Sequence, residues 1–286
     1  MADQMLTEPN AFTAIAALYR RARNLGYCLL DPFDALFRRI NRLGHYPPIH
    51  LRRHSSKLGS LDGLGREFRV ILKLLLALKS GQHIWDIGCG CGLLELALEG
   101  SGWRGPLVGT DIHKPSILWA QRTISRRVPL FRFLHADIYN SAYWPTGKLS
   151  AREWFSRFPD TEFDVIVAKS LFTHMLPDEL DIYLQQVGLR LKPTGKALFT
   201  FFLLNQEQQA LKTRNRPDFI KPAPNAVYAI RSPIAPSAAV AYEESHVLQC
   251  LESSALRLAD RIYYGWWTGR RDTLGGQDIV IVTKRQ

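Results

Sequence analysis

Strand-like and helix-like segments alternate along the chain from about residue 61 to its end. Short apolar runs occur at residues 83–86, 106–111, 130–136, 163–168, 196–204, 258–264 and 278–283. Apolar residues recur with helical spacing between many of these runs, at residues 64–79, 116–126, 178–191 and 243–255. This alternation predicts an α/β domain with a mainly parallel sheet, because parallel strands are joined by helical crossovers.

A glycine-rich turn follows the first of these runs. The sequence from Trp85 to Gly92 is Trp-Asp-Ile-Gly-Cys-Gly-Cys-Gly, so an acidic residue is followed by glycine at every second position. Glycine permits a sharp backbone turn and lets a ligand approach without a Cβ in the way. A second acidic residue, Asp111, ends the next strand, 19 residues after Gly92. This distance suits a carboxylate that binds ribose hydroxyls one strand away.

The spacing of the glycines distinguishes between nucleotide cofactors. A dinucleotide-binding turn has the pattern G-x-G-x-x-G, and in this chain the third glycine comes one residue early. The turn also has no Lys-Ser/Thr pair for a triphosphate. The pattern D-x-G-x-G-x-G resembles instead the first motif of class I S-adenosylmethionine-dependent methyltransferases.

The resemblance to class I methyltransferases continues along the chain in the order of that family's motifs. Residues 135–138, His-Ala-Asp-Ile, resemble the segment in which an acid meets the adenine amino group and the next backbone N–H meets the ring. Residues 163–174 resemble the fourth strand and its following loop. Residues 191–196, Leu-Lys-Pro-Thr-Gly-Lys, resemble the L-K-P-G-G-x turn, with Thr194 in place of its first glycine. The resemblance covers roughly residues 60–204.

This resemblance implies a Rossmann-like sheet of seven mainly parallel strands with helices on both faces, and S-adenosyl-L-methionine as cofactor. The cofactor-binding residues that we expect are Asp86, Gly88, Cys89, Gly90, Asp111, Ile112, Asp137, Ile138 and Lys169. A single aspartate at a strand end is more often a cap or turn residue. Here three aspartates follow three separate apolar strands, and that coincidence favours the binding role.

The cysteine pattern favours neither disulfides nor a metal. Cys89 and Cys91 lie one residue apart inside the turn, and Cys28 and Cys250 are far from them. This is typical of reduced thiols used as small residues. We expect no metal, because neither a second cysteine pair nor a histidine cluster at zinc spacing accompanies them. The sequence shows no signal peptide and no apolar run of membrane-spanning length, so we expect a cytoplasmic protein.

His174 is the candidate catalytic residue. It follows the fourth strand, so it is expected at the carboxyl edge of the sheet, where ligands bind in such folds. A neutral imidazole can take a proton from a hydroxyl or amine acceptor during methyl transfer. The alternative is a structural histidine hydrogen-bonded to the backbone. Nearby Phe172 could face the sulfonium as a cation–π partner, although core packing is the ordinary role.

Two long segments interrupt the alternation of strands and helices. Residues 139–160 are polar and aromatic, and residues 205–240 contain five prolines. Segments this long are usually functional lids or disordered. Both follow strands whose carboxyl ends lie at the expected ligand edge, so we predict that they form a lid. In this prediction Tyr143, Trp144 and Tyr228 line an acceptor pocket.

Positive charge gathers in the first part of the chain. The formal net charge is +11, and residues 1–80 contain 13 Lys and Arg against 6 Asp and Glu. We expect a basic helical arm over residues 1–60 and the methyltransferase domain over residues 61–286. Such a lobe suits nucleic acid, anionic lipid or an acidic small molecule, or is a solvated face. We expect Arg52 or Arg53 at the mouth of the acceptor pocket, favouring a carboxylate or phosphate.

The predicted function is S-adenosylmethionine-dependent methyl transfer to a small-molecule, glycan or lipid-linked acceptor, with a hydroxyl oxygen favoured. The charge supports an alternative, a nucleic-acid (RNA) methyltransferase. Against this, residues 168–171 are Ala-Lys-Ser-Leu, not the Asn/Asp-Pro-Pro-Tyr/Phe of enzymes that methylate exocyclic base amines. No RNA-binding module is recognisable either, so no specific nucleic acid is expected as a partner. A cofactor-binding protein without catalysis is the third alternative.

Overall fold

The computed structural model describes residues 11–52, 63–211 and 218–285 of the 286-residue chain. The chain forms two compact units, Met1–Gly59 and Ser60–Gln286. The predicted site residue Arg53 lies outside the described residues.

The described part of the first unit, residues 11–52, contains a long helix and a short one. Apolar residues have helical spacing at residues 11–23 and 33–43, and α1 (Ala11–Ile40) is one continuous helix that contains Pro32. A proline in a helix removes one backbone hydrogen bond, but the helical pattern resumes beyond it. The helix ends where Arg42 adopts a left-handed conformation, with φ 57°. The N–H of Leu43 then donates to the carbonyl of Arg38 at 2.7 Å, before the chain reaches α2 (Ile49–Arg52).

The second unit contains a seven-stranded sheet, which confirms the predicted fold class. Its strand order is β3-β2-β1-β4-β5-β10-β9. The strands are β1 (Ile84–Ile87), β2 (Leu107–Asp111), β3 (Phe131–His135), β4 (Phe163–Ala168), β5 (Leu191–Phe201), β9 (Leu256–Leu258) and β10 (Asp278–Lys284). Strands β1 to β5 are parallel to one another, and β10 runs antiparallel to both β5 and β9.

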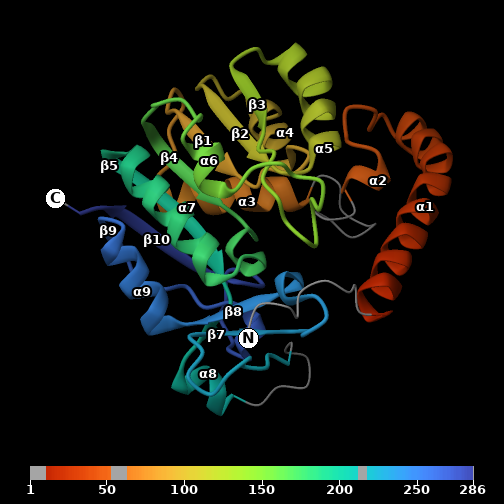
Figure 1. Cartoon of the computed structure of the whole chain (residues 1–286). Coiled ribbons are helices and arrows are strands. Elements are labelled where there is room, and N and C mark those ends of the chain that lie inside the picture. Colours follow the sequence, from red (N-terminus) through yellow and green to blue (C-terminus); the bar gives the residue numbers. More distant parts are fainter. Residues whose placement is uncertain (1–10, 53–62, 212–217, 286) are drawn as a thin grey trace. The chain divides into compact units, whose positions relative to one another are not determined.

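Helices cover both faces of this sheet (Figure 1). They are α3 (Gly63–Leu76), α4 (Leu93–Glu99), α5 (Lys114–Ala120) with η1 (Gln121–Ser125), α6 (Ala151–Phe155), α7 (Pro177–Arg190) and α9 (Glu244–Ser253). Helices α6, α7 and α9 pack on one face, and α3 packs against α4 on the other. Short 3-10 turns are η2 (Phe172–His174) and η4 (Trp266–Thr268).

The predicted long segment at residues 205–240 is built into a second, three-stranded sheet. Its order is β6 (Leu203–Leu204), β8 (Val240–Glu243) and β7 (Tyr228–Ile230), and the segment also contains α8 (Gln206–Ala210) and η3 (Pro236–Ala238). The predicted strand 196–204 is therefore split, because the Leu203 N–H donates to the Asp278 carboxylate at 2.7 Å instead of extending β5. The predicted strand 258–264 has the wrong bounds, since beyond β9 only Tyr263 pairs with β10.

The core lies on both sides of the central strands. The Trp85 ring on β1 is fully buried and stacks on Phe158 and Phe163, with ring centroids 4.8 and 5.4 Å apart. Its indole N–H donates to the hydroxyl of Thr110 at 3.1 Å. Strand β1 is buried along its whole length, as parallel strands covered on both faces are. This rigid strand carries Asp86 to the ligand edge of the sheet. Within the described residues no helix is long and apolar enough to cross a membrane.

Candidate active site

Strands β1 to β4 end side by side, because they are parallel and adjacent in the sheet. Asp86 on β1 is level with Gly109 on β2 and Val167 on β4. Asp111 ends β2 and is level with His135 at the end of β3. The predicted cofactor residues from three motifs are therefore brought to one edge of the sheet.

The glycine-rich turn after β1 needs its glycines for both conformation and space. Gly88, Gly90 and Gly92 have φ values of 77°, 58° and 81°, a region that other residues rarely adopt. A Cβ on Gly92 would lie 2.6 Å from the Ile124 side chain. A Cβ on Gly109 would lie 3.0 Å from the Cys89 sulfur, so this glycine makes room for the buried thiol. Burial raises the pKa of that thiol well above its ordinary value, and no disulfide joins any of the four cysteines.

The Asp111 carboxylate is held by two backbone N–H groups. Gly90 donates to one oxygen at 2.8 Å, and His113 donates to the other at 2.7 Å. Burial raises the pKa of Asp111, while the two N–H donors oppose that shift. A carboxylate oxygen can accept more than one hydrogen bond. Asp111 is thus fixed in orientation and retains capacity to accept from two hydroxyl groups.

A second acidic group, not predicted from the sequence, lies beside Asp86. The Glu95 side chain on α4 is fully buried, and the negative charge of nearby Asp86 disfavours its ionisation. Burial raises the pKa of Asp86 to about 7 and raises that of Glu95 well above its ordinary value. The positive charge of Lys169 opposes the shift at Asp86. Lys169 also lies over the Phe68 ring, 4.6 Å from its centroid, and burial lowers its pKa. Burial and mutual repulsion thus oppose simultaneous ionisation of the two carboxyls.

The segment at residues 139–160 places Trp144 on the predicted adenine-binding acid. The Trp144 indole N–H donates to Asp137 at 2.9 Å. Asn140 forms the turn that carries this side chain, because its side-chain oxygen accepts the N–H groups of Ala142 and Tyr143 at 3.1 and 3.0 Å. The Trp144 ring packs edge-on against His135, with centroids 5.4 Å apart. Trp144 therefore lies at the end of β3 beside the cofactor residues.

The backbone around Ile138 differs from the pattern that the resemblance implies. The Ile138 N–H, expected on the adenine ring, donates to the Ala136 carbonyl at 2.7 Å. Ile138 itself is buried, and Ile112 packs against the same core cluster. The Ile112 carbonyl contacts the His135 ring nitrogen at 3.1 Å. The two isoleucines thus supply apolar surface next to Asp111 and Asp137.

Both long segments meet at His174. The Tyr143 hydroxyl, from residues 139–160, lies 2.9 Å from His174 Nδ1. The Ser237 carbonyl, from residues 205–240, lies 3.1 Å from the same nitrogen. A carbonyl only accepts hydrogen bonds, whereas the Tyr143 hydroxyl can donate or accept, so we assign the proton to Nδ1. The lone pair of the neutral ring is then on Nε2.

Burial lowers the pKa of His174, and backbone hydrogen bonds to Ser237 and Ala238 partly offset that effect. Its ordinary value is 6.5, so the ring is neutral above that pH. The ring is thus in the protonation state that a general base requires.

A cluster of polar side chains next to the His174 turn fixes the conformation of the loop after β4. Ser170 has a left-handed φ of 55°, and its N–H donates to the Thr200 hydroxyl at 2.7 Å. The hydroxyls of both residues donate to the Gln277 side-chain oxygen at 2.8 Å. The Gln277 side-chain nitrogen lies 3.4 Å from the Thr173 hydroxyl. Thr200 of β5 and Gln277, the residue before β10, thereby position the turn that ends in His174.

Phe172 packs in the core, stacked on Phe201 with centroids 5.2 Å apart and fully buried. Tyr228 lies on β7, with its ring 6.4 Å from that of Tyr242. The Tyr242 hydroxyl donates at 2.7 Å to the carbonyl of Met175, the residue after His174. Tyr228 is therefore connected to the His174 turn through Tyr242.

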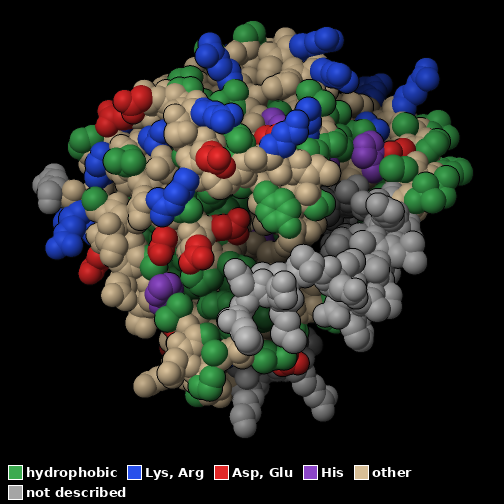
Figure 2. Space-filling view, in the orientation of Figure 1, with side chains coloured by type: hydrophobic (Ala, Val, Ile, Leu, Met, Phe, Trp, Pro, Cys, Tyr) green, Lys and Arg blue, Asp and Glu red, His purple; other side chains and the backbone are tan. Residues whose placement is uncertain are grey.

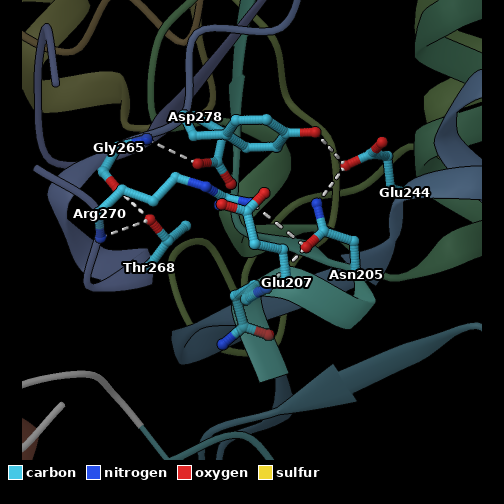
Figure 3. Close-up of polar contacts among 9 residues, drawn as sticks. Asn205, Glu207, Glu244, Gly265, Thr268, Arg270 and Asp278 are labelled. Atoms are coloured by element: carbon cyan, nitrogen blue, oxygen red, sulfur yellow. Dashed lines mark hydrogen bonds and ion pairs between the residues drawn. The ribbon is translucent and has the colours of Figure 1, made fainter. Parts of the chain in front are cut away.

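Figure 3 shows a polar cluster formed by residues next to the second sheet and by the loop before β10. Arg270 pairs with Glu207 on α8 at 2.6 Å and stacks over the Tyr264 ring at 3.8 Å. The side chain of Asn205 caps α8 and donates to Glu244 at 2.7 Å. The loop before β10 is thereby joined to the beginning of residues 205–240.

Asp278, in the same cluster, is a fully buried carboxylate with three donors. They are the backbone N–H groups of Gly265 and Leu203, both at 2.7 Å, and the Trp267 indole N–H at 2.8 Å. Burial raises the pKa of Asp278 to about 7, and the three donors oppose that shift. The side chain joins both sheets and η4 at one point.

Arg52 belongs to the first unit, where its guanidinium is buried and ion-paired with Asp34. This pairing gives it a structural role in that unit. Its predicted place at the mouth of an acceptor pocket remains a prediction.

A family model described as "Methyltransferase domain" matches residues 61–228, more than half of the chain and the part that carries this geometry. The chain belongs to the class I S-adenosylmethionine-dependent methyltransferases. Its seven-stranded, mainly parallel sheet with helices on both faces is the fold that the sequence resemblance implied.

Curated relatives match less than half of this methyltransferase. It is 26% identical over 133 residues to the ribosomal protein L11 methyltransferase of Burkholderia lata. It is 27% identical over 131 residues to the protein of the same name from Burkholderia vietnamiensis. Each match covers 46% of this chain, and the chain spans about a third of those relatives' length, 36% and 35%.

Solved structures share the fold of the methyltransferase at low sequence identity. The PH0226 protein from Pyrococcus horikoshii aligns with a TM-score of 0.51 and 17% identity, over 80% of this chain and 93% of that one. The glycopeptide N-methyltransferase MtfA aligns with a TM-score of 0.50 and 11% identity, over 77% and 90% of the two chains. These likenesses concern the fold alone.

The observed groups fit the cofactor of this family, S-adenosyl-L-methionine. The molecule has ribose hydroxyls, an adenine ring, and an ammonium and a carboxylate at its methionine end. Asp111 provides an oriented acceptor for hydroxyls, and Asp137 with the two isoleucines provides a polar group beside apolar surface. Asp86 and Lys169 offer opposite charges near the glycine turn. Each part of the cofactor therefore has a group of suitable chemistry in the site.

Proposed function

We propose that this methyltransferase transfers a methyl group to a hydroxyl oxygen of a small-molecule, glycan or lipid-linked acceptor, with His174 as general base. One observation carries the proposal. The contact of the Ser237 carbonyl with His174 Nδ1 supports a tautomer with the proton on Nδ1 and the lone pair on Nε2, which would accept a proton from an acceptor hydroxyl. A base is more useful for a hydroxyl than for a neutral amine, which has its own lone pair.

Different residues bind different parts of S-adenosylmethionine. Asp111 accepts from the ribose hydroxyls, and Asp137 accepts from the adenine amino group beside Ile112 and Ile138. Asp86 and Lys169 bind the charged methionine end, and the turn formed by Gly88, Cys89 and Gly90 lets the backbone approach closely. When bound, the cofactor supplies a methyl group already activated by its sulfonium.

The protein's remaining task is to orient the acceptor and exclude water. Orientation of two reactants in one site contributes several kcal/mol to lowering a barrier. Tyr143 and the Ser237 carbonyl bring both long segments against His174, so these segments would cover the acceptor. Trp144 and Tyr228 are the aromatic residues that we assign to its pocket.

The acceptor class can be tested by label transfer. The full-length protein would be incubated with methyl-labelled S-adenosylmethionine and separated fractions of small molecules, glycans, lipids, RNA and proteins from the source cells. We expect label in one of the first three fractions, and mass spectrometry should place it on oxygen. Label in RNA or protein, or on nitrogen, would contradict the proposed acceptor.

The role of His174 is tested by His174→Gln on the acceptor so identified. We expect kcat to fall about 100-fold, with nearly unchanged affinity for S-adenosylmethionine, because the base acts only in the chemical step. His246→Gln, which alters a histidine stacked on Tyr242, is the matched control. A His174→Gln protein with full kcat would exclude the base. A lower melting temperature with a small kinetic effect would mark a structural histidine.

A further inference from the structure

Helix α1 exposes a continuous apolar stripe. Its members recur three or four residues apart, so they share one side of the helix. They are Leu25, Leu29, Phe33, Leu36, Phe37 and Ile40. Phe33 is 72% exposed and Ile40 is 71% exposed. Aromatic and branched side chains that are this exposed form an apolar surface of the kind that binds a protein partner or a membrane.

The other side of α1 packs through charged groups. Asp34 accepts from Arg38 at 2.7 Å and also pairs with the buried Arg52 of α2. Asp31 pairs with His50, also on α2. Within the described part of its unit, α1 therefore uses its polar side for internal packing. This is the reverse of an ordinary globular helix, which buries its apolar side.

Positive charge accompanies the stripe. The unit Met1–Gly59 contains nine Lys and Arg against four Asp and Glu, a formal charge of +5. Two of those acids are the ion-paired Asp31 and Asp34. Arg39 and Arg42, at the end of the stripe, are exposed. Figure 2 shows hydrophobic side chains along the coloured part of α1.

We infer that α1 binds the surface of an anionic lipid bilayer. An amphipathic helix with Leu and Phe on one side and excess Arg lies in the interface, with its apolar side at the boundary of headgroups and acyl chains. Basic residues add attraction to anionic lipid. A second copy of the same helix would bring like charges together, so charge favours the lipid surface over self-association. The inference is independent of the proposed methyl acceptor.

Vesicle cosedimentation of the full-length protein tests the apolar part of this surface. We expect binding to vesicles that contain phosphatidylglycerol and little binding to pure phosphatidylcholine. Phe33→Gln and Phe37→Gln should each weaken the partition coefficient about tenfold or more, since each removes an apolar side chain from the lipid. Leu189→Gln, at an equally exposed leucine on α7, is the matched control and should bind like the wild type.

Two further measurements test the contribution of positive charge to binding and the insertion of α1 into the bilayer. Arg39→Gln should weaken binding about fivefold, and added salt should weaken binding of the wild type. Phe33→Trp keeps an apolar residue, and its fluorescence should shift to shorter wavelength on anionic vesicles.

Three outcomes would overturn the inference. The first is absent binding to phosphatidylglycerol vesicles. The second is a stable dimer in sedimentation velocity that Phe33→Gln dissociates, which would make a second copy the occupant. The third is a lower melting temperature in Phe33→Gln without vesicle binding, which would mean that the stripe packs within the chain.

Discussion

Asp111 shows how a single residue prepares the cofactor site. Backbone N–H groups from the glycine turn and from the residue after Ile112 hold both of its oxygens before any ligand arrives. Preorganised charge-assisted hydrogen bonds are roughly twice as strong as neutral ones. The carboxylate therefore contributes to affinity without a large ordering cost on binding.

Asp111→Ala should weaken the binding of S-adenosylmethionine by about 1.5–3 kcal/mol, since charge-assisted hydrogen bonds to the ribose are lost. Isothermal calorimetry measures this. Asp260→Ala, at an exposed carboxylate, should bind like the wild type. Equal affinities in the Asp111→Ala and wild-type proteins would remove Asp111 from the site.

At the scale of single residues, the sequence predicted those site residues whose positions follow from strand order and motif spacing. Asp86, Asp111, Asp137 and His174 follow four separate strands, so the sheet brings them to one edge. It missed the Ser237 carbonyl and Gln277, because a backbone acceptor 63 residues from His174 and a glutamine 107 residues from Ser170 have no local signature.

At the scale of elements, the described parts of the two long segments contain more secondary structure than their composition predicts. Residues 205–240, which we predict to form a lid, contribute strands to a three-stranded sheet. Strands of two to four residues are stabilised by long-range pairing and not by local pattern, so periodicity did not reveal them. The turn at Asn140, by contrast, follows from a side chain known to form such turns.

Asp278→Asn tests the junction of the two sheets. Three N–H groups donate to this carboxylate, and an amide would turn an N–H toward at least one of them. We expect the free energy of unfolding to fall by about 1–3 kcal/mol, the cost of an unsatisfied buried group. Thermal melting monitored by circular dichroism would measure it, with Asp260→Asn as control. An unchanged melting temperature would show that the junction contributes little.

At the scale of the whole molecule, the net charge of +11 raises the question of nucleic acid. We expect weak, sequence-independent binding to RNA that is lost near physiological salt, because electrostatic binding falls steeply with salt, with a slope of about −0.9 per phosphate on duplex DNA. Fluorescence anisotropy over a salt series would measure it. Sequence-selective binding that persists at physiological salt, with methyl label on the RNA, would favour the nucleic-acid alternative.

The pH dependence of kcat on the identified acceptor tests the central claim most directly. A base must be neutral, and burial lowers the pKa of His174 below 6.5. In the wild type, kcat should therefore be constant around neutral pH and fall on the acid side with a midpoint below 6.5. His174→Gln should lose that acid limb, with circular dichroism confirming the fold at each pH. The same acid limb in His174→Gln, or a wild-type kcat that rises as the pH falls, would contradict the account.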